Sequence, residues 1–359
     1  MPDLLISDQD KLDALTERLA ESTRLVLDTE FVREKTYHPQ ACLLQIATGD
    51  TLACVDLRAP LDFGTIGPVL LNRDSTKVIH AARQDLEIFY RFLGNIPGPL
   101  FDTQIAAAFC GFPDQIGYAG LVQQLLGVTL DKQHTRTDWS RRPLSDAQLE
   151  YAADDVRYLV EIDALLRERL QQLGRLEWAA EESRRLEDES LYKIEPENAA
   201  DRVKGRSKLQ PASRAVVNAL AEWREREAQD RDRPRQWILK DQELIALAET
   251  KPTDSESLQA ILGRRLRGGK ESTVLGLIRG SVDTVVADEP MPPPLTAKQK
   301  ADISRLMKQL REIAEDVGIS APLLATRRDV TRFVLGEREL ELLKGWRREV
   351  AGELLATCD

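Results

Sequence analysis

The sequence is poor in the side chains that bind transition metals. Its 359 residues include only three histidines and four cysteines, and neither type shows a zinc-site spacing such as C-x-x-C or H-x-x-x-H. This argues against both a disulfide framework and a thiolate zinc site. Any bound metal would be held by oxygen ligands, which favours magnesium or manganese.

Long hydrophobic runs are also missing. No apolar stretch approaches the ~18 residues of a membrane span, and Met1-Pro2-Asp3 does not begin a basic and then apolar signal peptide. We therefore expect a cytoplasmic protein without a membrane partner. Nothing in the sequence indicates an obligate protein partner.

The net charge of -10 is unevenly distributed. Residues 1–200 carry 21 Lys and Arg against 34 Asp and Glu, whereas the remaining residues carry 29 against 26. The length allows two or three domains, and an acidic part followed by a mildly basic part suits a polyanionic substrate. The small basic excess is equally compatible with no nucleic-acid role.

One apolar stretch, Leu25–Phe31, ends in two carboxylates one residue apart. The run predicts a buried strand, on which Asp28 and Glu30 point to the same face. Two adjacent carboxylates repel each other unless a proton or cation lies between them, so this is a candidate metal site. With 60 acidic residues, roughly ten D/E-x-D/E triplets are expected from composition, so a solvated strand end is the alternative.

Alternating strands and helices surround this stretch. A hairpin of strands is predicted at 41–48 and 51–57, and a short strand at 77–80 precedes a helix at 84–93 with Asp85 in its first turn. Another helix is predicted to begin near Thr103. This order predicts an α/β fold around a mixed sheet.

A later helix carries a second motif. Ser145 is its predicted N-cap, and Tyr151 and Asp155 lie four residues apart, hence on one face. A phenol one turn from a carboxylate can hold a metal-bound water, although a surface Tyr and Asp is the alternative. Asp154 offers a second carboxylate, and the spacing from Tyr151 favours Asp155.

These motifs together resemble a known family. D-T-E-F at 28–31, H-A-A-R-Q-D-L at 80–86 and Y-A-A-D-D-V at 151–156 resemble the three exonuclease motifs of the DEDD superfamily, in the subgroup with a catalytic tyrosine. T-D-W-S-R-R-P-L-S-D-A-Q-L-E-Y at 137–151, with L-L-Q-I-A at 43–47 and F-D-T-Q-I-A at 101–106, is similar to bacterial ribonuclease D. The resemblance implies a ribonuclease H-like exonuclease domain over residues 1–175.

The resemblance also implies a mechanism and a substrate. It assigns Asp28 as a ligand shared by two divalent ions, Mg²⁺ or Mn²⁺, Glu30 and Asp155 to the ion that activates water, and Asp85 to the other ion. Tyr151 would orient the water. The implied reaction removes nucleoside 5′-monophosphates from RNA 3′ ends, most plausibly those of transfer-RNA precursors. The residues that flank Glu30, Thr29 and Phe31, are candidates for nucleic-acid contacts.

The second half of the sequence is predicted to be all-helical. W-R-E-R-E-A-Q-D-R-D-R-P-R-Q-W-I-L-K-D at 223–241 resembles the HRDC domain, and I-S-A-P-L-L-A-T-R-R-D-V at 319–330 with L-L-K-G-W-R at 342–347 resembles a second, divergent one. The expected divisions are a connector at 176–210, a first HRDC domain at 211–287, a Pro-rich linker at 288–294 and a second HRDC-like domain at 295–359. Arg264, Arg265, Arg267 and Lys270 are candidate phosphate contacts. A solvated helical face is the alternative for each.

Two other functions compete with an exoribonuclease. The same constellation serves proofreading exonucleases that act on DNA, and a non-catalytic RNA-binding adaptor is an alternative of another class. All four carboxylates and the tyrosine are present, which favours an enzyme.

Overall fold

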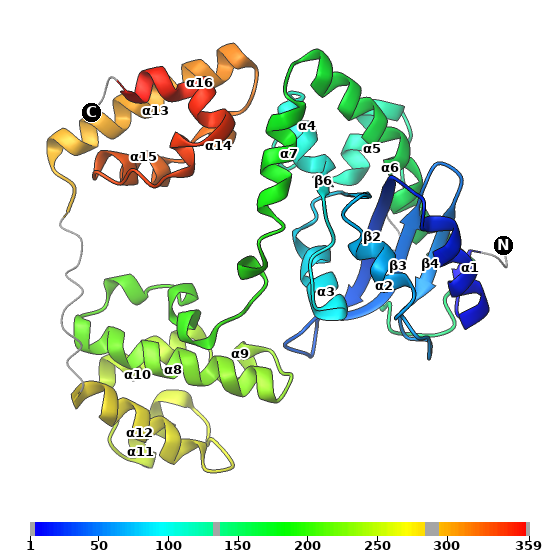
Figure 1. The fold of residues 1–359 in the computed structure, drawn as a ribbon. Coiled ribbons are helices and arrows are strands. Elements are labelled where there is room, and N and C mark those ends of the chain that lie inside the picture. The colour runs from blue at the N-terminus through cyan, green and yellow to red at the C-terminus, as the bar shows by residue number, and fades with distance from the viewer. Residues whose placement is uncertain (1–3, 132–136, 284–293, 357–359) are drawn as a thin grey trace. The chain divides into compact units, whose positions relative to one another are not determined.

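The computed structural model describes residues 4–131, 137–283 and 294–356, and these form two compact units. The first unit contains residues 1–32, 41–192 and 295–359, and the second contains residues 33–40 and 193–294 (Figure 1). The predicted linker 288–294 lies outside the described residues except for Pro294, and so do residues 284–287 of the predicted first HRDC domain. The predicted domain boundaries stay predictions.

The first unit is built on a six-stranded mixed sheet in the order β1-β4-β3-β2-β5-β6. Strands β3 and β4 form the predicted antiparallel hairpin, in which Leu43 pairs with Asp56 and Ala47 with Leu52. Strands β1 and β4, β2 and β5, and β5 and β6 pair in parallel. The bounds are β1 Leu5–Ile6, β2 Arg24–Val32, β3 Gln40–Ala47, β4 Leu52–Asp56, β5 Thr76–Ile79 and β6 Leu100–Asp102.

Helices cover both faces of this sheet (Figure 1). One face packs on α1, α2 and α3, whose apolar side chains meet Leu25 and Leu27 of β2. The other face packs on α4, α5 and the long helix α6, whose side chains meet Val26 and Val78. The bounds are α1 Gln9–Leu19, α2 Ile66–Leu71, α3 Arg83–Leu93, α4 Thr103–Phe109, α5 Tyr118–Leu126, α6 Asp146–Gln172, α7 Leu176–Arg185 and the 3₁₀ helix η1 Glu189–Leu191.

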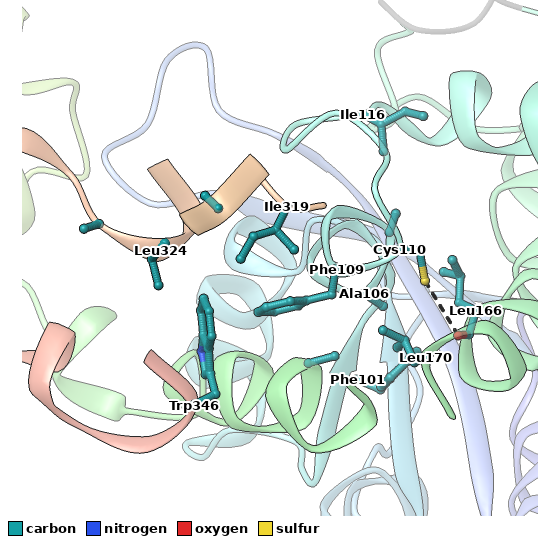
Figure 2. Close-up of a cluster of buried hydrophobic side chains, with 14 of the residues drawn as sticks. Phe101, Ala106, Phe109, Cys110, Ile116, Leu166, Leu170, Ile319, Leu324 and Trp346 are labelled. Carbon is teal, nitrogen blue, oxygen red and sulfur yellow. Dashed lines mark hydrogen bonds between the residues drawn. The ribbon is translucent and has the colours of Figure 1, made fainter. Parts of the chain in front are cut away.

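The C-terminal helices belong to the same unit and share its core. Trp346 is 1% exposed, stacks on Trp178 with ring centroids 5.2 Å apart, and meets Phe109 edge-on at 5.0 Å. Figure 2 shows Trp346 facing Phe109, with Ile319 and Leu324 beside them. The bounds are α13 Ala297–Val317, α14 Ala321–Leu324, α15 Arg327–Val334, η4 Glu341–Leu343 and α16 Gly345–Ala356. The segment that resembles a second HRDC domain is therefore packed against the nuclease.

The second unit is helical and has its own core, to which α8 contributes Val216, Val217 and Leu220. Its bounds are η2 Pro196–Arg202, η3 Arg206–Lys208, α8 Pro211–Asp230, α9 Arg235–Ile238, α10 Asp241–Thr250, α11 Ser255–Leu262 and α12 Lys270–Asp283. The predicted α/β sheet domain and helical elements are confirmed. Within the described ranges, no helix is both long and apolar enough to span a membrane.

Candidate active site

The alternation of side chains along β2 separates its apolar anchors from its carboxylates. Leu25 and Leu27 lie in the core beneath α1 to α3, while Val26 lies in the core beneath α6. Because alternate residues of a strand share a face, Asp28 and Glu30 follow Val26 toward α6. The sequence thus places both carboxylates on the side where α6 crosses the sheet.

Helix α6 supplies the third carboxylate. Its N-terminus is fixed by a capping box in which Ser145 accepts from the Gln148 N–H and Gln148 accepts from the Ser145 N–H. Ala152, Ala153 and Val156 of this helix are fully buried, and this packing sets its rotation. One carboxylate oxygen from each of Asp28, Glu30 and Asp155 lies within 4.8 Å of the others.

Asp85 is held beside this cluster by β2 itself. Its Oδ1 accepts hydrogen bonds from the Thr29 hydroxyl, at 2.6 Å, and from the Thr29 backbone N–H, at 3.1 Å. Both residues are buried. Asp85 is not in the three-residue cluster, but its charge contributes to the raised pKa values of Asp28 and Glu30. The structure thus brings all four predicted carboxylates into one neighbourhood.

Burial and mutual repulsion make these carboxyl groups resist ionisation. Burial, followed by repulsion from the other carboxylates, holds the pKa of Asp28 well above its usual range and raises the pKa of Glu30 to about 9. Burial, followed by the charges of Asp154 and Asp85, raises the pKa of Asp155 to about 7. The pKa of Asp85 is raised to about 6, chiefly by burial. Within the described residues, none of these four carboxylates forms an ion pair with a lysine or arginine.

The residues therefore fit a divalent cation. Converging carboxylates whose negative charges lack a basic partner in the described chain are stabilised by a cation between them. Because all the donors are oxygen atoms, the site suits a hard ion. Asp28, Glu30 and Asp155 are the residues placed to hold it.

Asp154 faces a different environment from its neighbour. Its carboxylate pairs with Arg157, which also pairs with Glu150 at 2.7 Å. Its backbone carbonyl accepts a hydrogen bond of 2.6 Å from the Tyr118 hydroxyl. The helical register therefore directs Asp155, and not Asp154, to the cluster.

Tyr118 is a residue that the sequence analysis missed. Burial and then the charges of Asp155 and Asp28 raise the pKa of its hydroxyl. By its bond to the Asp154 carbonyl, it fixes α6 one residue from Asp155. Tyr118 lies in none of the motifs found in the sequence, so no signal distinguished it from other residues.

Tyr151 and the residues flanking Glu30 occupy distinct places. Tyr151 is half-buried, one helical turn before Asp155, and its ring lies 6.2 Å from that of Trp139. Phe31 is half-buried, whereas Thr29 is 6% exposed and holds Asp85. The structure thus gives Thr29 a supporting contact, and its predicted contact with nucleic acid stays a prediction.

The predicted basic contacts near Gly268 are mostly paired with carboxylates. Arg264 pairs with Glu243, Arg265 with Glu271 at 3.8 Å, and Lys270 with Glu227 at 2.6 Å. Arg267 is exposed, and its side chain forms no ion pair with the described residues. Their role as phosphate contacts stays a prediction, and the carboxylates reduce the local positive charge.

Comparison with known proteins agrees with this geometry. Residues 4–171 match the 3′-5′ exonuclease family and residues 213–267 match the HRDC domain. The chain is 40% identical to ribonuclease D of Gluconacetobacter diazotrophicus, over 98% of this chain and 91% of the relative, and 41% identical to ribonuclease D of Acidiphilium cryptum, over 97% and 91%. The crystal structure of Escherichia coli RNase D, described as an exoribonuclease involved in structured RNA processing, superposes with a TM-score of 0.88 at 33% identity, covering 98% of this chain and 97% of that one. This chain belongs to the ribonuclease D family.

Proposed function

We propose that this protein is a 3′→5′ exoribonuclease that hydrolyses RNA at the carboxylate cluster and releases nucleoside 5′-monophosphates. The observation that carries the proposal is the convergence of Asp28, Glu30 and Asp155 within 4.8 Å in a chain that matches the exonuclease family. The relatives' shared name supports RNA as the substrate.

Two divalent ions, Mg²⁺ or Mn²⁺, would supply an activated water and neutralise the charge that develops on the phosphate. Asp28, Glu30 and Asp155 would hold these ions, with Asp85 on the Thr29 side of the cluster. Asp28, Glu30 and Asp155 are half-buried, so their attraction for a cation is screened less than at a fully exposed surface. The protein's task is to fix these four groups before substrate arrives.

Tyr151 is the group that positions the attacking water. It lies one turn from Asp155 on the same helix, so its hydroxyl and that carboxylate reach the same region. The ring is beside Trp139, which is 3% exposed, and this contact limits the movement of the phenol.

The physiological substrate we propose is the 3′ end of a structured RNA precursor, namely of transfer RNA. Opening paired nucleotides costs about 1–2 kcal/mol per step, and the sequence carries no ATP-dependent motor motif to supply it. Trimming should therefore stop near a duplex. The cytoplasmic location stays a prediction.

The reaction class is tested by its products. Single-stranded RNA and DNA oligonucleotides of the same sequence are incubated in parallel with Mg²⁺, and the released mononucleotides are separated by chromatography. We expect nucleoside 5′-monophosphates, released faster from RNA. Release of 3′-monophosphates or of longer fragments would contradict the mechanism, and faster release from DNA would contradict the substrate.

A further inference from the structure

The segment Arg33–Gln40 leaves the end of β2 and packs within the helical second unit. The Tyr37 hydroxyl donates a hydrogen bond of 2.5 Å to Glu225 of α8. Asp232, just after α8, accepts from the backbone N–H groups of Tyr37 and His38 at 3.0 and 3.1 Å. Three hydrogen bonds therefore anchor the chain that immediately follows the catalytic strand.

Glu225 is a buried carboxylate that forms ion pairs with two arginines. It is 1% exposed, and Arg202 and Arg235 each place a guanidinium nitrogen 3.9 Å from its Oε1. The side chains of these arginines remain 41% and 39% exposed. One buried carboxylate thus holds two guanidinium groups together and neutralises only one of them, which leaves a positive charge facing solvent.

These arginines line a hollow of about 430 Å³, here called the arginine groove, with Arg33 and Gln236. Glu34, which also lines it, offsets part of the charge. A second hollow of about 620 Å³ shares Gln236 and is lined by Lys204 and Lys240. Two acidic residues also line it: Asp241, which pairs with the buried Arg224, and Glu249, which offsets part of the positive charge. Because Gln236 of α9 lines both hollows, they adjoin at this residue.

An exposed aromatic residue follows Gln236 in the chain. Trp237 follows Gln236 in α9 and is 57% exposed, although a tryptophan is normally shielded from water. Cationic grooves with an exposed aromatic side chain bind single-stranded nucleic acids, because the cations follow the phosphates and the ring stacks on a base.

We propose that the arginine groove and the adjoining hollow bind the phosphate backbone of single-stranded RNA, with Trp237 stacking on a base. The inference rests on the proposed function for the identity of the ligand. Arg33 lies three residues after Glu30, so the chain limits the separation of their Cα atoms to about 11 Å. RNA bound at Arg33 is therefore close to the strand that carries the catalytic carboxylates.

The test measures binding of the full-length protein to a fluorescent single-stranded RNA oligonucleotide in excess chelator, so that no turnover occurs. Arg33→Ala is compared with Lys35→Ala, which removes the same charge from the same exposed segment but from a residue that does not line the groove. We expect Arg33→Ala to weaken binding on the order of fivefold and to reduce the slope of log K against log salt by about 0.7. Lys35→Ala should change both much less. Equal effects of the two substitutions would overturn the proposal.

A second pair of variants separates this surface from the cations near Gly268. Arg235→Ala is compared with Arg267→Ala, and Trp237→Ala tests stacking. We expect Trp237→Ala to weaken binding on the order of tenfold, and Arg235→Ala to weaken it more than Arg267→Ala does. Circular dichroism identifies any unfolded variant, and in that case the Arg33 and Lys35 pair decides the outcome. Weaker binding by Arg267→Ala alone would overturn the proposal.

Cleavage of the same RNA by the wild-type protein is measured separately with Mg²⁺. Failure to cleave RNA would refute the proposed function without involving the groove. Normal cleavage combined with unchanged binding by Arg33→Ala, Arg235→Ala and Trp237→Ala would refute the groove alone.

Discussion

Asp155→Asn and Asp154→Asn form a matched pair, because they make the same chemical change at adjacent positions. Asp155 lies in the three-carboxylate cluster, whereas Asp154 pairs with Arg157 on the surface of α6. We expect Asp155→Asn to abolish turnover and Asp154→Asn to retain most of it.

The structure sets the size of each effect. Replacing one of three converging carboxylates weakens stabilisation of the transition state by several kcal/mol, and each 1.36 kcal/mol is about tenfold in rate, so the loss should be at least roughly thousandfold. At position 154, Arg157 keeps its ion pair with Glu150, and the hydrogen bond from Tyr118 to the backbone survives. A surface pair contributes about 0–1 kcal/mol, so the rate should fall less than about fivefold.

Thermal unfolding separates loss of a ligand from loss of the fold. Asp155→Asn removes one of the charges that repel Asp28, so the metal-free variant should unfold at or above the wild-type temperature at pH 8. It should also lose most of the stabilisation by Mg²⁺, which at 100 times Kd is about 2.7 kcal/mol. Single-turnover cleavage of a labelled RNA gives the rates. A larger rate loss for Asp154→Asn, or an unchanged Mg²⁺ response in Asp155→Asn, would refute the helical register on which the site is built.

Three further outcomes follow from other parts of the structure. Tyr151→Phe should keep the Mg²⁺-induced rise in unfolding temperature but cleave RNA about 10²-fold more slowly or worse, because only the group that positions water is removed. Loss of the Mg²⁺-induced rise in unfolding temperature would contradict this. In chelator, the free energy of unfolding should fall as pH rises from 5 to 8, because raised pKa values such as that of Glu30, about 9, mean that the folded state binds more protons than the unfolded state. Stabilisation by Mg²⁺ should grow over the same pH range. An equally steep fall in the Glu30→Gln variant would exclude Glu30 as the cause. Trp346→Ala should lower the free energy of unfolding by about 3–5 kcal/mol in urea titrations. The control Trp237→Ala, at an exposed position, should change it by less than about 0.5 kcal/mol. Equal effects of the two substitutions would show that the C-terminal helices are not part of the nuclease core.

Local periodicity was sufficient to predict much of the site. Alternation along β2 predicted that Asp28 and Glu30 share a face, and the four-residue spacing on α6 selected Asp155 over Asp154. Both arguments depend on neighbours within one element, where the backbone geometry is fixed. The position of Asp85 could be predicted only by resemblance, because its contact with Thr29 joins residues far apart in the chain.

The sequence analysis did not predict contacts between different helices and strands. The carboxylate partner of Arg264 lies 21 residues away, and hydrophobic periodicity does not reveal such pairs. The packing of Trp346 on Phe109 joins two segments that periodicity treats as separate domains. A chain cut near Gln210 would therefore lose part of the nuclease core. The first unit includes the C-terminal helices as well as residues 1–32 and 41–192.

The most direct test of the central claim uses an RNA hairpin with a single-stranded 3′ tail, labelled at its 5′ end. With Mg²⁺, the wild-type protein should produce a ladder that shortens one nucleotide at a time from the 3′ side and halts close to the stem, and excess chelator should abolish it. Internal cuts, equal digestion of a blunt duplex, or full activity in chelator would contradict a metal-dependent 3′→5′ exoribonuclease at the cluster of Asp28, Glu30 and Asp155.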